Sequence, residues 1–411
     1  MPELHPTLQA LSVPALRAFL ASRFFGVTAR SLLHAALAWH IFDLTREGAR
    51  FGPEFWLGLR GLMEFLPVVP VGLLGGAIAD FRDRRDLVAL ARLGTLVCVG
   101  GLWLGTGNVG NELALIYAVV FAHAVTWGIE FPANQSMLPT LVPREIFPNT
   151  VVVSALVRNA AFAAGPVAAG FAIEAGGPKS AYALSGILYA MSLVALFRVP
   201  RRGPPETTKR PDLAAVKEGI TFVLGKPVIL SAMALDMVAV ILAEPAALLA
   251  VFAGDILDLG PRGYGLLAAA TAIGTMSASV VLLVRRSFQR PGRALLGAVL
   301  VFGVGAVVFG ASRSFPLSLA ALIVAGAADQ VSQVARSTLV QLTTPDSLRG
   351  RVSAVNMIFI SASNELGGAF SGFFAAATSA PFAIVTGGLA CLAVTSAVAR
   401  RVAPLRHWTL R

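Results

Sequence analysis

Long apolar segments follow one another along this chain of 411 residues, and only short polar stretches separate them. A membrane-spanning helix needs about 20 mostly apolar residues, and a dozen segments meet this requirement. A proline-rich, charged stretch at residues 200–211 divides them into two sets of six. The predicted spans are 14–44, 54–79, 87–107, 112–138, 147–174, 179–198, 225–253, 263–284, 293–311, 316–342, 348–377 and 380–402.

Polar side chains recur at helical spacing within three of these spans, so each set occupies one helix face. Ionisable groups at membrane depth are costly and usually mark a transport pathway. The three sets are Arg23, Arg30 and His34; His123, Trp127, Glu130 and Asn134; and Asp329, Gln333 and Arg336. Other spans contain further polar residues, namely Arg158, Asp236, Glu244, Asn364 and Glu365.

A repeat relates the two sets of spans at a constant offset of 202 residues. We therefore predict two pseudo-symmetric six-helix bundles, at residues 1–199 and 215–411, joined by a cytoplasmic linker at 200–214. Such direct repeats place a central site between two halves. The offset maps Pro143 to Pro345, Gly165 to Gly367, Gly170 to Gly372, Gly186 to Gly388, Trp127 to Asp329 and Asn134 to Arg336.

The composition excludes an ordinary soluble domain, since 56% of the residues are hydrophobic and only 13% are charged, and the mean hydropathy is +0.74. The fold class is an all-α integral membrane protein with twelve spans. The net charge is +11, and most of the basic residues between spans lie in loops on one side of the membrane. This distribution predicts cytoplasmic termini and argues against nucleic-acid binding. The N-terminus lacks the features of a cleavable signal peptide.

No motif supports catalysis or a cofactor. The sequence has no phosphate-binding G-x-x-x-x-G-K-[ST] motif, no metal-ligand spacing and no credible catalytic triad. Cys98 and Cys391 lie inside apolar segments and are expected to be packing residues. We therefore expect a protein that is not an enzyme, has no cofactor and draws its energy from an ion gradient.

Four short motifs resemble the major facilitator superfamily and, within it, the branch of the bacterial enterobactin exporter. Residues 75–85 read GGAIADFRDRR, similar to the superfamily's loop signature, and residues 343–355 read TTPDSLRGRVSAV after Gln341. Residues 289–292 (QRPG) and 142–145 (VPRE) strengthen the likeness. The resemblance implies a monomeric exporter of a small molecule in the bacterial cytoplasmic (inner) membrane, whose first, fourth, seventh and tenth spans line the cavity.

The resemblance also implies a latch that holds the outward-facing state. Small residues allow close helix packing, and an aspartate past a helix end can meet the N-terminus of a neighbouring helix. The arginines either pair with an acid across the cytoplasmic gap or only set topology. The latch candidates are Gly75, Gly76, Asp80, Arg84 and Arg85.

Buried acids beside movable cations suit proton exchange, because such acids can take up and release protons near neutral pH. Fixed ion pairs are the structural alternative for every one of them. Arg30, Arg158 and Arg336 are candidates for an anionic substrate group or for charge pairing, and Trp127 is a candidate for stacking on a ring. The proton candidates are Glu130, Asp236, Asp329, Glu244 and Glu365.

The working hypothesis is a secondary transporter that exports a small amphipathic compound, siderophore or drug-like, by proton antiport with alternating access. A lipid or lysolipid flippase of the same fold is an alternative, distinguished by an apolar lateral opening. A membrane receptor or scaffold that transports nothing is a second alternative. It would need a sizeable partner-binding segment, and the short loops argue against it.

Overall fold

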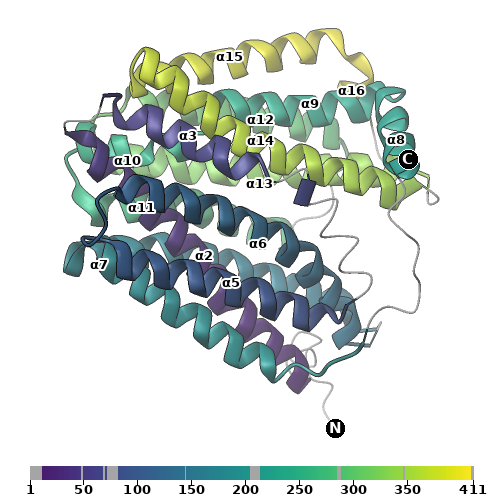
Figure 1. The fold of residues 1–411 in the computed structure, drawn as a ribbon. Coiled ribbons are helices and arrows are strands. Elements are labelled where there is room, and N and C mark those ends of the chain that lie inside the picture. Colours follow the sequence, from purple (N-terminus) through teal and green to yellow (C-terminus); the bar gives the residue numbers. More distant parts are fainter. Residues whose placement is uncertain are drawn as a thin grey trace. The chain divides into compact units, whose positions relative to one another are not determined.

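The computed structural model describes residues 12–47, 50–67, 70–71, 82–143, 145–203, 213–284, 288–345 and 348–408. Every element within this part of the chain is helical, and each predicted span has a counterpart (Figure 1). The helices are α2 (Pro14–Arg46), α3 (Pro53–Phe65), α5 (Arg84–Gly105), α6 (Glu112–Leu141), α7 (Phe147–Phe197), α8 (Leu213–Leu224), α9 (Pro227–Ala243), η1 (Ala246–Leu248), α10 (Leu249–Val251), η2 (Phe252–Ile256), α11 (Gly260–Val284), α12 (Pro291–Ala311), α13 (Phe315–Thr343), α14 (Arg349–Ala377), α15 (Ala380–Arg401) and α16 (Ala403–His407).

Eight helical segments of the described chain are long and apolar enough to cross a membrane. The helices α2, with 33 residues, and α14, with 29, also have the length of a span, but both carry charged residues within it. Helix α3 covers the first part of the predicted span 54–79, and most of the remainder lies outside the described residues. The eight segments are Arg84–Gly105, Glu112–Leu141, Phe147–Phe197, Pro227–Ile256, Gly260–Leu283, Pro291–Ala311, Phe315–Thr343 and Ala380–Arg401.

The element α7 comprises two spans. Its 51 residues would extend about 75 Å as one helix, more than twice the hydrocarbon thickness of a bilayer. The chain breaks at Gly176 and Gly177, and Gly177 has φ 70° and ψ −175°. A residue with a Cβ rarely adopts this conformation, so glycine permits the sharp connection. The break separates the predicted spans 147–174 and 179–198.

The helices form two compact units. The first comprises Met1–His40 and Leu66–Pro211, and the second comprises Ile41–Phe65 and Asp212–Arg411. The contacts therefore group α3 with the second unit, where it packs on α14. Glycines allow this contact: a Cβ on Gly61 would lie 2.7 Å from the Ala369 nitrogen, and a Cβ on Gly372 would overlap the Gly58 Cα.

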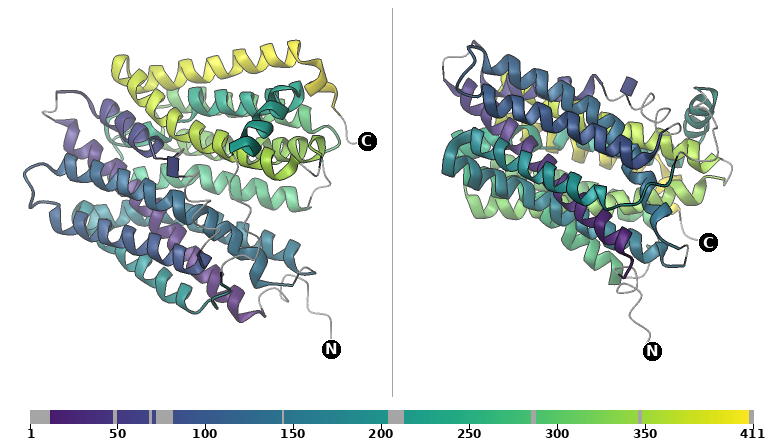
Figure 2. Two further views of the ribbon diagram at one scale, coloured as in Figure 1. Left: turned by 45° about the vertical axis from the view of Figure 1, so that its right-hand side comes forward. Right: turned by 60° about the horizontal axis from the view of Figure 1, so that its bottom comes forward.

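An apolar cluster holds α2, α5, α6 and both parts of α7 together in the first unit. It includes Leu16, Val88, Met137, Val153 and Leu193, all of them buried. Figure 2 shows these helices packed along one another from two further directions. Packing between helices, rather than burial from water, supplies most of the stability of such a bundle in lipid. The polar side chains described below lie within this scaffold.

Repeated glycines make repeated contacts in the two units. Gly165 of α7 faces Leu32 of α2, whereas its counterpart Gly367 of α14 faces Val240 and Ile241 of α9. Likewise, Gly186 packs on α5 through Leu96 and Val99, and Gly388 packs on α12 through Gly303 and Val307. The offset in the sequence thus corresponds to equivalent helix pairs, because a small residue is required at the same crossing in each unit.

Asp83 anchors the start of the predicted linker to α5. Its Oδ1 accepts a hydrogen bond from the Arg85 backbone nitrogen at 2.9 Å, which caps the helix. Its Oδ2 accepts from the backbone nitrogens of Arg202, at 3.0 Å, and Gly203, at 2.8 Å. One carboxylate therefore serves both as a helix cap and as an attachment for the chain that leaves α7.

The seventh span is interrupted in the second unit. Helix α9 ends at Ala243, Glu244 has extended φ/ψ of −77° and 116°, and Pro245 follows. A proline disfavours helical conformation in the residue before it and cannot donate a helical hydrogen bond. The chain resumes through η1, α10 and η2, and η2 is a π-helix. Glu244 thus lies at the point where the regular helical backbone is interrupted. Binding sites of transporters often lie at such interruptions.

The contact between α11 and α13 gives a direct test of helix packing. A Cβ on Gly326 would overlap the Thr271 carbonyl, and a Cβ on Gly274 would overlap the Ile323 carbonyl. We expect Gly326→Ala to lower the free energy of unfolding by about 1–3 kcal/mol, because overpacking forces the two helices apart. Thermal unfolding of the purified protein measures this effect.

Gly297→Ala is the matched control. Gly297 is exposed on α12, and an added Cβ meets no atom of the described residues within 4 Å. This substitution should change the stability by less than about 0.5 kcal/mol. Equal stability of the two variants would contradict the close α11–α13 packing.

Candidate functional site

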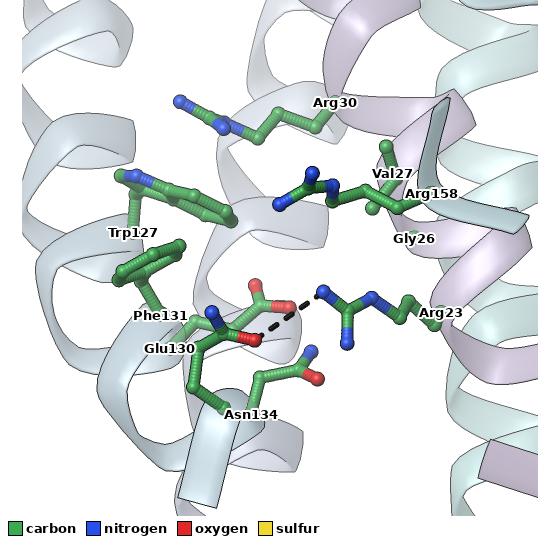
Figure 3. A pocket seen from close by; sticks show the side chains of 10 residues that line it. Arg23, Gly26, Val27, Arg30, Trp127, Glu130, Phe131, Asn134 and Arg158 are labelled. Carbon is green, nitrogen blue, oxygen red and sulfur yellow. Dashed lines mark hydrogen bonds between the residues drawn. The ribbon is translucent and has the colours of Figure 1, made fainter. Parts of the chain in front are cut away.

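A pocket opens inside the first unit between α2, α6 and the first part of α7. It encloses about 420 Å³ of space not filled by atoms, part of it open solvent. Arginines from α2 and α7 form one wall, and the side chains of α6 form the facing wall (Figure 3). The lining residues are Arg23, Gly26, Val27, Arg30, Trp127, Glu130, Phe131, Asn134, Gln135 and Arg158.

Helical spacing explains why these side chains meet. Arg23 and Arg30 lie seven residues apart on α2, which is nearly two turns, so they project from the same face. Trp127, Glu130 and Asn134 repeat at three and four residues on α6. Pro132 lies among the latter and cannot donate the usual hydrogen bond to the residue four positions earlier. The polar faces predicted from the sequence therefore face one another within a single unit.

Two arginines of the pocket bond only to neutral groups in the described chain. Arg23 donates from Nη1 to Ser154 Oγ at 3.0 Å and from Nη2 to Gln135 Oε1 at 3.3 Å. Arg158 donates from Nε to Asn159 Oδ1 at 3.4 Å. Among the described residues, no carboxylate lies within ion-pair distance of either guanidinium. Arg158 also lies close enough to Arg23 for their like charges to repel each other.

The third arginine is held against an aromatic ring. The guanidinium carbon of Arg30 lies 3.4 Å from the centre of the Trp127 ring, on which it stacks. The Phe131 ring is 5.3 Å from the Trp127 ring, so α6 presents two adjacent aromatic groups to the pocket. A stacked guanidinium keeps its in-plane N–H groups directed outward. Such an arrangement is suited to an anion beside a planar apolar group.

A buried cluster of hydrogen bonds centred on Arg92 of α5 lies beside the pocket. Arg92 donates to Glu130 Oε1 from Nε, at 2.8 Å, and its Nη2 forms a salt bridge to the same oxygen at 2.8 Å. Its Nη1 donates to Ser22 Oγ and Ser192 Oγ, each at 2.6 Å. Arg92 is only 1% exposed. The cluster therefore joins α2, α5, α6 and the second part of α7 through one side chain.

Glu130 has its charge compensated by this pair, although it also lines the pocket. Two unit charges about 4 Å apart attract by about 4 kcal/mol at the effective dielectric of a protein surface, and more strongly where water is excluded. This geometry corresponds to the fixed ion pair that was the structural alternative for Glu130. Glu130 is therefore paired with Arg92 rather than with Arg23 or Arg158 of the pocket.

The two histidines on the polar faces meet outside the pocket. The rings of His34 and His123 are 5.3 Å apart in an edge-to-face arrangement. His123 Nδ1 also lies 3.4 Å from Thr95 Oγ1. These contacts connect α2, α5 and α6, and neither ring lines the pocket.

The second unit holds a different set of charges. Asp236 of α9 and Arg336 of α13 form a buried ion pair, with Oδ2 and Nη2 3.1 Å apart. Arg336 Nη1 also donates to Asn356 Oδ1 of α14 at 3.0 Å. Arg336 is therefore bound to an acid and an amide of its own unit, and three helices converge on its guanidinium.

Two further acids lie near this ion pair. Asp329 lies about two helical turns before Arg336 on α13 and interacts electrostatically with Asp236 and Arg336. Glu244, at the break after α9, lies close enough to Asp329 for their negative charges to repel. The acid cluster is defined as Asp236, Glu244 and Asp329, and two of its members, Asp236 and Asp329, interact with Arg336.

Three further candidates remain besides the two charge sets. Gln333 is half-buried on α13, between Asp329 and Arg336 in the sequence, and Asn364 is exposed on α14. Glu365 of α14 lies near Arg60 of α3, which pairs with Glu64 through an Nη2–Oε1 distance of 3.0 Å. Glu365 therefore belongs to the contact between α3 and α14.

The described part of the latch bonds within the first unit. Arg84 Nη1 donates to the Ser136 carbonyl at 2.8 Å. Arg85 Nη2 donates to the Phe197 carbonyl at 3.1 Å, and its guanidinium lies 5.4 Å from the Phe197 ring. Both arginines thus secure the start of α5 to neighbouring helix ends. The other latch candidates, Gly75, Gly76 and Asp80, lie outside the described residues.

The sequence analysis did not select Arg92, Ser22, Ser192 or Asn356. Arg92 is the single arginine well inside its apolar span, about 12 Å from the start of α5 at Arg84. A lone arginine at that depth was a detectable signal, because an unpaired charge is costly there. The serines and the asparagine gave no such signal, because their partners lie on other helices.

Comparison with known proteins identifies this architecture. A family model described as transmembrane secretion effector, within the major facilitator superfamily, matches residues 61–409. The enterobactin exporter EntS of Escherichia coli O1:K1 / APEC is 24% identical over 343 residues, which cover 83% of this chain and 80% of EntS. These similarities confirm the predicted resemblance to that exporter branch and indicate a transporter rather than an enzyme.

Solved structures confirm the fold class. A POT family transporter in complex with 5-aminolevulinic acid has a TM-score of 0.74 at 11% identity, covering 95% of this chain and 96% of that one. A bacterial homolog of the human lysosomal transporter Spinster, inward-facing, has a TM-score of 0.71 at 14% identity and covers 97% and 98%. The nucleoside transporter NupG has a TM-score of 0.69 at 12% identity, covering 95% and 99%.

The ion pair beside the pocket makes a prediction about stability. Glu130→Gln leaves the Arg92 guanidinium buried without its counter-charge, so we expect the free energy of unfolding to fall by about 3–5 kcal/mol. Thermal unfolding of the purified protein measures the loss. Glu145→Gln, at an exposed acid after α6, should change stability by less than about 0.5 kcal/mol.

A paired substitution separates lost attraction from an isolated charge. Arg92→Met combined with Glu130→Met removes both charges, and the combination should be less destabilising than Glu130→Gln alone. If the double variant is instead the less stable protein, the bonds from Arg92 to Ser22 and Ser192 matter more than its pairing with Glu130.

Proposed function

The chain belongs to the transmembrane secretion effector family of the major facilitator superfamily, and from this premise we propose that it exports a small amphipathic compound in exchange for protons. Transport proceeds by alternating access, in which movements of the two units open the binding site first to one side of the membrane and then to the other. The likeness to EntS, the enterobactin exporter, supports export rather than uptake. A siderophore or a drug-like compound fits the mixture of charged and aromatic groups in the pocket.

One observation carries the proposal: the two units contain opposite kinds of buried charge. The pocket of the first unit has Arg23 and Arg158, which have no ion-pair partner among the described residues, together with Trp127 and Phe131. The second unit has the acid cluster, and two of its acids, Asp236 and Asp329, interact with Arg336. In this proposal the arginines of the first unit bind the substrate, and the acids of the second unit bind the proton.

The acid cluster supports proton exchange through its excess of carboxylates. Arg336 compensates Asp236 directly, so Glu244 and Asp329 are left to repel each other. Repulsion between neighbouring acids is relieved when one of them holds a proton. We therefore assign the exchangeable proton to Asp329 and Glu244, with Asp236 as the partner that holds Arg336 in place. Glu130 acts as a structural partner of Arg92.

The protein in this proposal is a monomer in the bacterial cytoplasmic (inner) membrane, with both termini in the cytoplasm. The basic loops of the sequence support that orientation. A difference of one pH unit is worth about 1.4 kcal/mol per proton, equivalent to about a tenfold concentration ratio for a substrate exchanged one for one. Exchange with more protons, or a contribution from membrane potential, raises this ratio.

Purified protein in liposomes tests the exchange. The vesicles are loaded with enterobactin or with ethidium, and the external pH is made one unit lower than the internal pH. We expect faster efflux of at least one compound, together with proton entry reported by a luminal dye. Asp329→Asn should reduce efflux driven by the pH gradient at least tenfold while leaving exchange between equal internal and external pools, because the substrate pocket is intact.

Asp258→Asn is the control for this variant. Asp258 is exposed, and its φ of 50° is a conformation that asparagine also tolerates. It should export at the rate of the unaltered protein. The proposal is wrong if neither compound moves with the gradient, or if Asp329→Asn and Glu244→Gln both leave proton entry unchanged.

A further inference from the structure

From the pocket of the first unit we infer that the transported compound is an aromatic organic acid, whose negatively charged group binds between Arg23 and Arg158 and whose ring lies against Trp127 and Phe131. This inference rests on the proposed function, which assigns substrate binding to that pocket. The proposed function leaves the charge of the amphipathic compound open, and this inference specifies an anion. The argument uses the charge of the pocket, its aromatic wall and one buried amide.

The charge of the pocket calls for an anion. Glu130 is paired with Arg92, so Arg23 and Arg158 add two positive charges to the pocket that no carboxylate of the described residues pairs with. Arg23 and Arg158 repel each other, and their hydrogen bonds go to the neutral acceptors Ser154, Gln135 and Asn159. Like charges held close in a poorly hydrated site are unfavourable unless a counter-charge enters. A ligand carboxylate would supply that charge with charge-assisted hydrogen bonds.

Arg158 is the arginine best placed to bind the incoming group. Its only hydrogen bond within the described chain uses Nε, at the long distance of 3.4 Å. The two terminal nitrogens are therefore available to a ligand, and Figure 3 shows the guanidinium extending into the space between Arg30 and Arg23. A planar guanidinium with two adjacent donors matches the two oxygens of a carboxylate.

The facing wall requires an apolar, planar group rather than a small inorganic anion. Trp127 and Phe131 are neighbours on α6, with ring centres 5.3 Å apart, and Figure 3 places them across the pocket from the arginines. Aromatic rings stack or pack edge to face at such distances.

A buried amide adds a hydrogen-bond donor to the expected ligand. Asn134 Oδ1 is buried and has no hydrogen-bond partner among the described residues. Asn134 lines the pocket on the aromatic wall. An unsatisfied buried acceptor costs about 1–3 kcal/mol, which a donor on the ligand would recover. The inferred compound therefore has a hydroxyl or N–H group at a distance from its acidic group.

A direct measurement of binding tests the charge of the ligand. Hydroxynaphthoate combines a ring, an anion and a hydroxyl donor, and hydroxynaphthamide has the same ring and hydroxyl with a neutral amide. Isothermal titration calorimetry on the purified full-length protein at neutral pH should give at least tenfold tighter binding of the anion. Equal binding of the two probes, or binding of neither, would overturn the inference.

Variants locate the binding to the pocket. Arg158→Gln should reduce the preference for the anion to less than threefold and leave the affinity for the amide unchanged within twofold. Arg158→Lys retains a positive charge and should preserve part of the preference. Arg198→Gln, at an exposed arginine after α7, is the control and should bind both probes as the unaltered protein does.

Membrane potential provides a test that needs no variant. Export of a monoanion against entry of one proton moves two positive charges inward, a neutral compound moves one and a monovalent cation moves none. A potential of about 100 mV, negative inside, changes the attainable concentration ratio about 50-fold for each charge moved. In liposomes with a potassium diffusion potential, efflux of hydroxynaphthoate should therefore respond to potential far more strongly than efflux of ethidium.

The outcomes of these experiments separate the two hypotheses. If a pH gradient drives efflux of enterobactin or ethidium but hydroxynaphthoate neither binds nor moves, the aromatic-acid inference fails and proton-coupled export stands. If hydroxynaphthoate binds with the expected dependence on Arg158 but no compound responds to a pH gradient, the pocket is an anion site and proton antiport fails.

Discussion

The arrangement of the first unit depends on the buried ion pair between Arg92 and Glu130. Arg92 is 1% exposed, and in addition to Glu130 it bonds to Ser22 and Ser192. A single guanidinium therefore fixes the spacing of four helices, since its donors are held in one plane. Gly26 leaves the room for it, because a Cβ there would lie 3.1 Å from the Arg92 Cζ. By pairing with Glu130, Arg92 also removes that acid as a partner for Arg23 and Arg158 in the neighbouring pocket, which is the basis of the inferred preference for an anion.

The two units share a scaffold but not a chemistry. Gly165 and Gly367 make the same kind of helix contact in their units, as do Gly186 and Gly388, because close packing in lipid restricts a crossing to small residues. No such restriction acts on side chains that point into a cavity. At the repeated positions the first unit has Trp127 and Asn134, whereas the second has Asp329 and Arg336. One unit therefore presents rings and an amide beside arginines, and the other presents acids around an ion pair.

Sequence reasoning predicted the parts of the structure that depend on one helix at a time. Spans follow from apolar length, and polar faces follow from helical period, which is why Arg23, Arg30, Trp127 and Glu130 were found and do meet. Partners on different helices have no common period. The depth of Arg92 in its span was a signal, but its pairing with Glu130 could not be predicted for this reason, and so the role of Glu130 stayed open between proton carriage and a fixed pair. Asn356 was missed similarly: an asparagine in a mixed segment gives no signal until α13 and α14 are placed side by side.

The separation of charges constrains how transport is coupled. In a carrier where proton and substrate compete for one acid, displacement itself couples their movements. Here the arginines of the pocket belong to the first unit and the acid cluster belongs to the second. Neither Asp329 nor Glu244 lines the pocket. A proton bound to either acid therefore does not compete directly with a substrate bound there. In the proposed antiport, coupling therefore has to pass through the conformational equilibrium: each ligand must bind one state more tightly than the other, and its effect cannot exceed that difference in affinity. The residues that set the equilibrium then matter as much as those that bind, and helix contacts without room for a Cβ, such as those at Gly58, Gly61 and Gly372, limit how far the packed helices can shift.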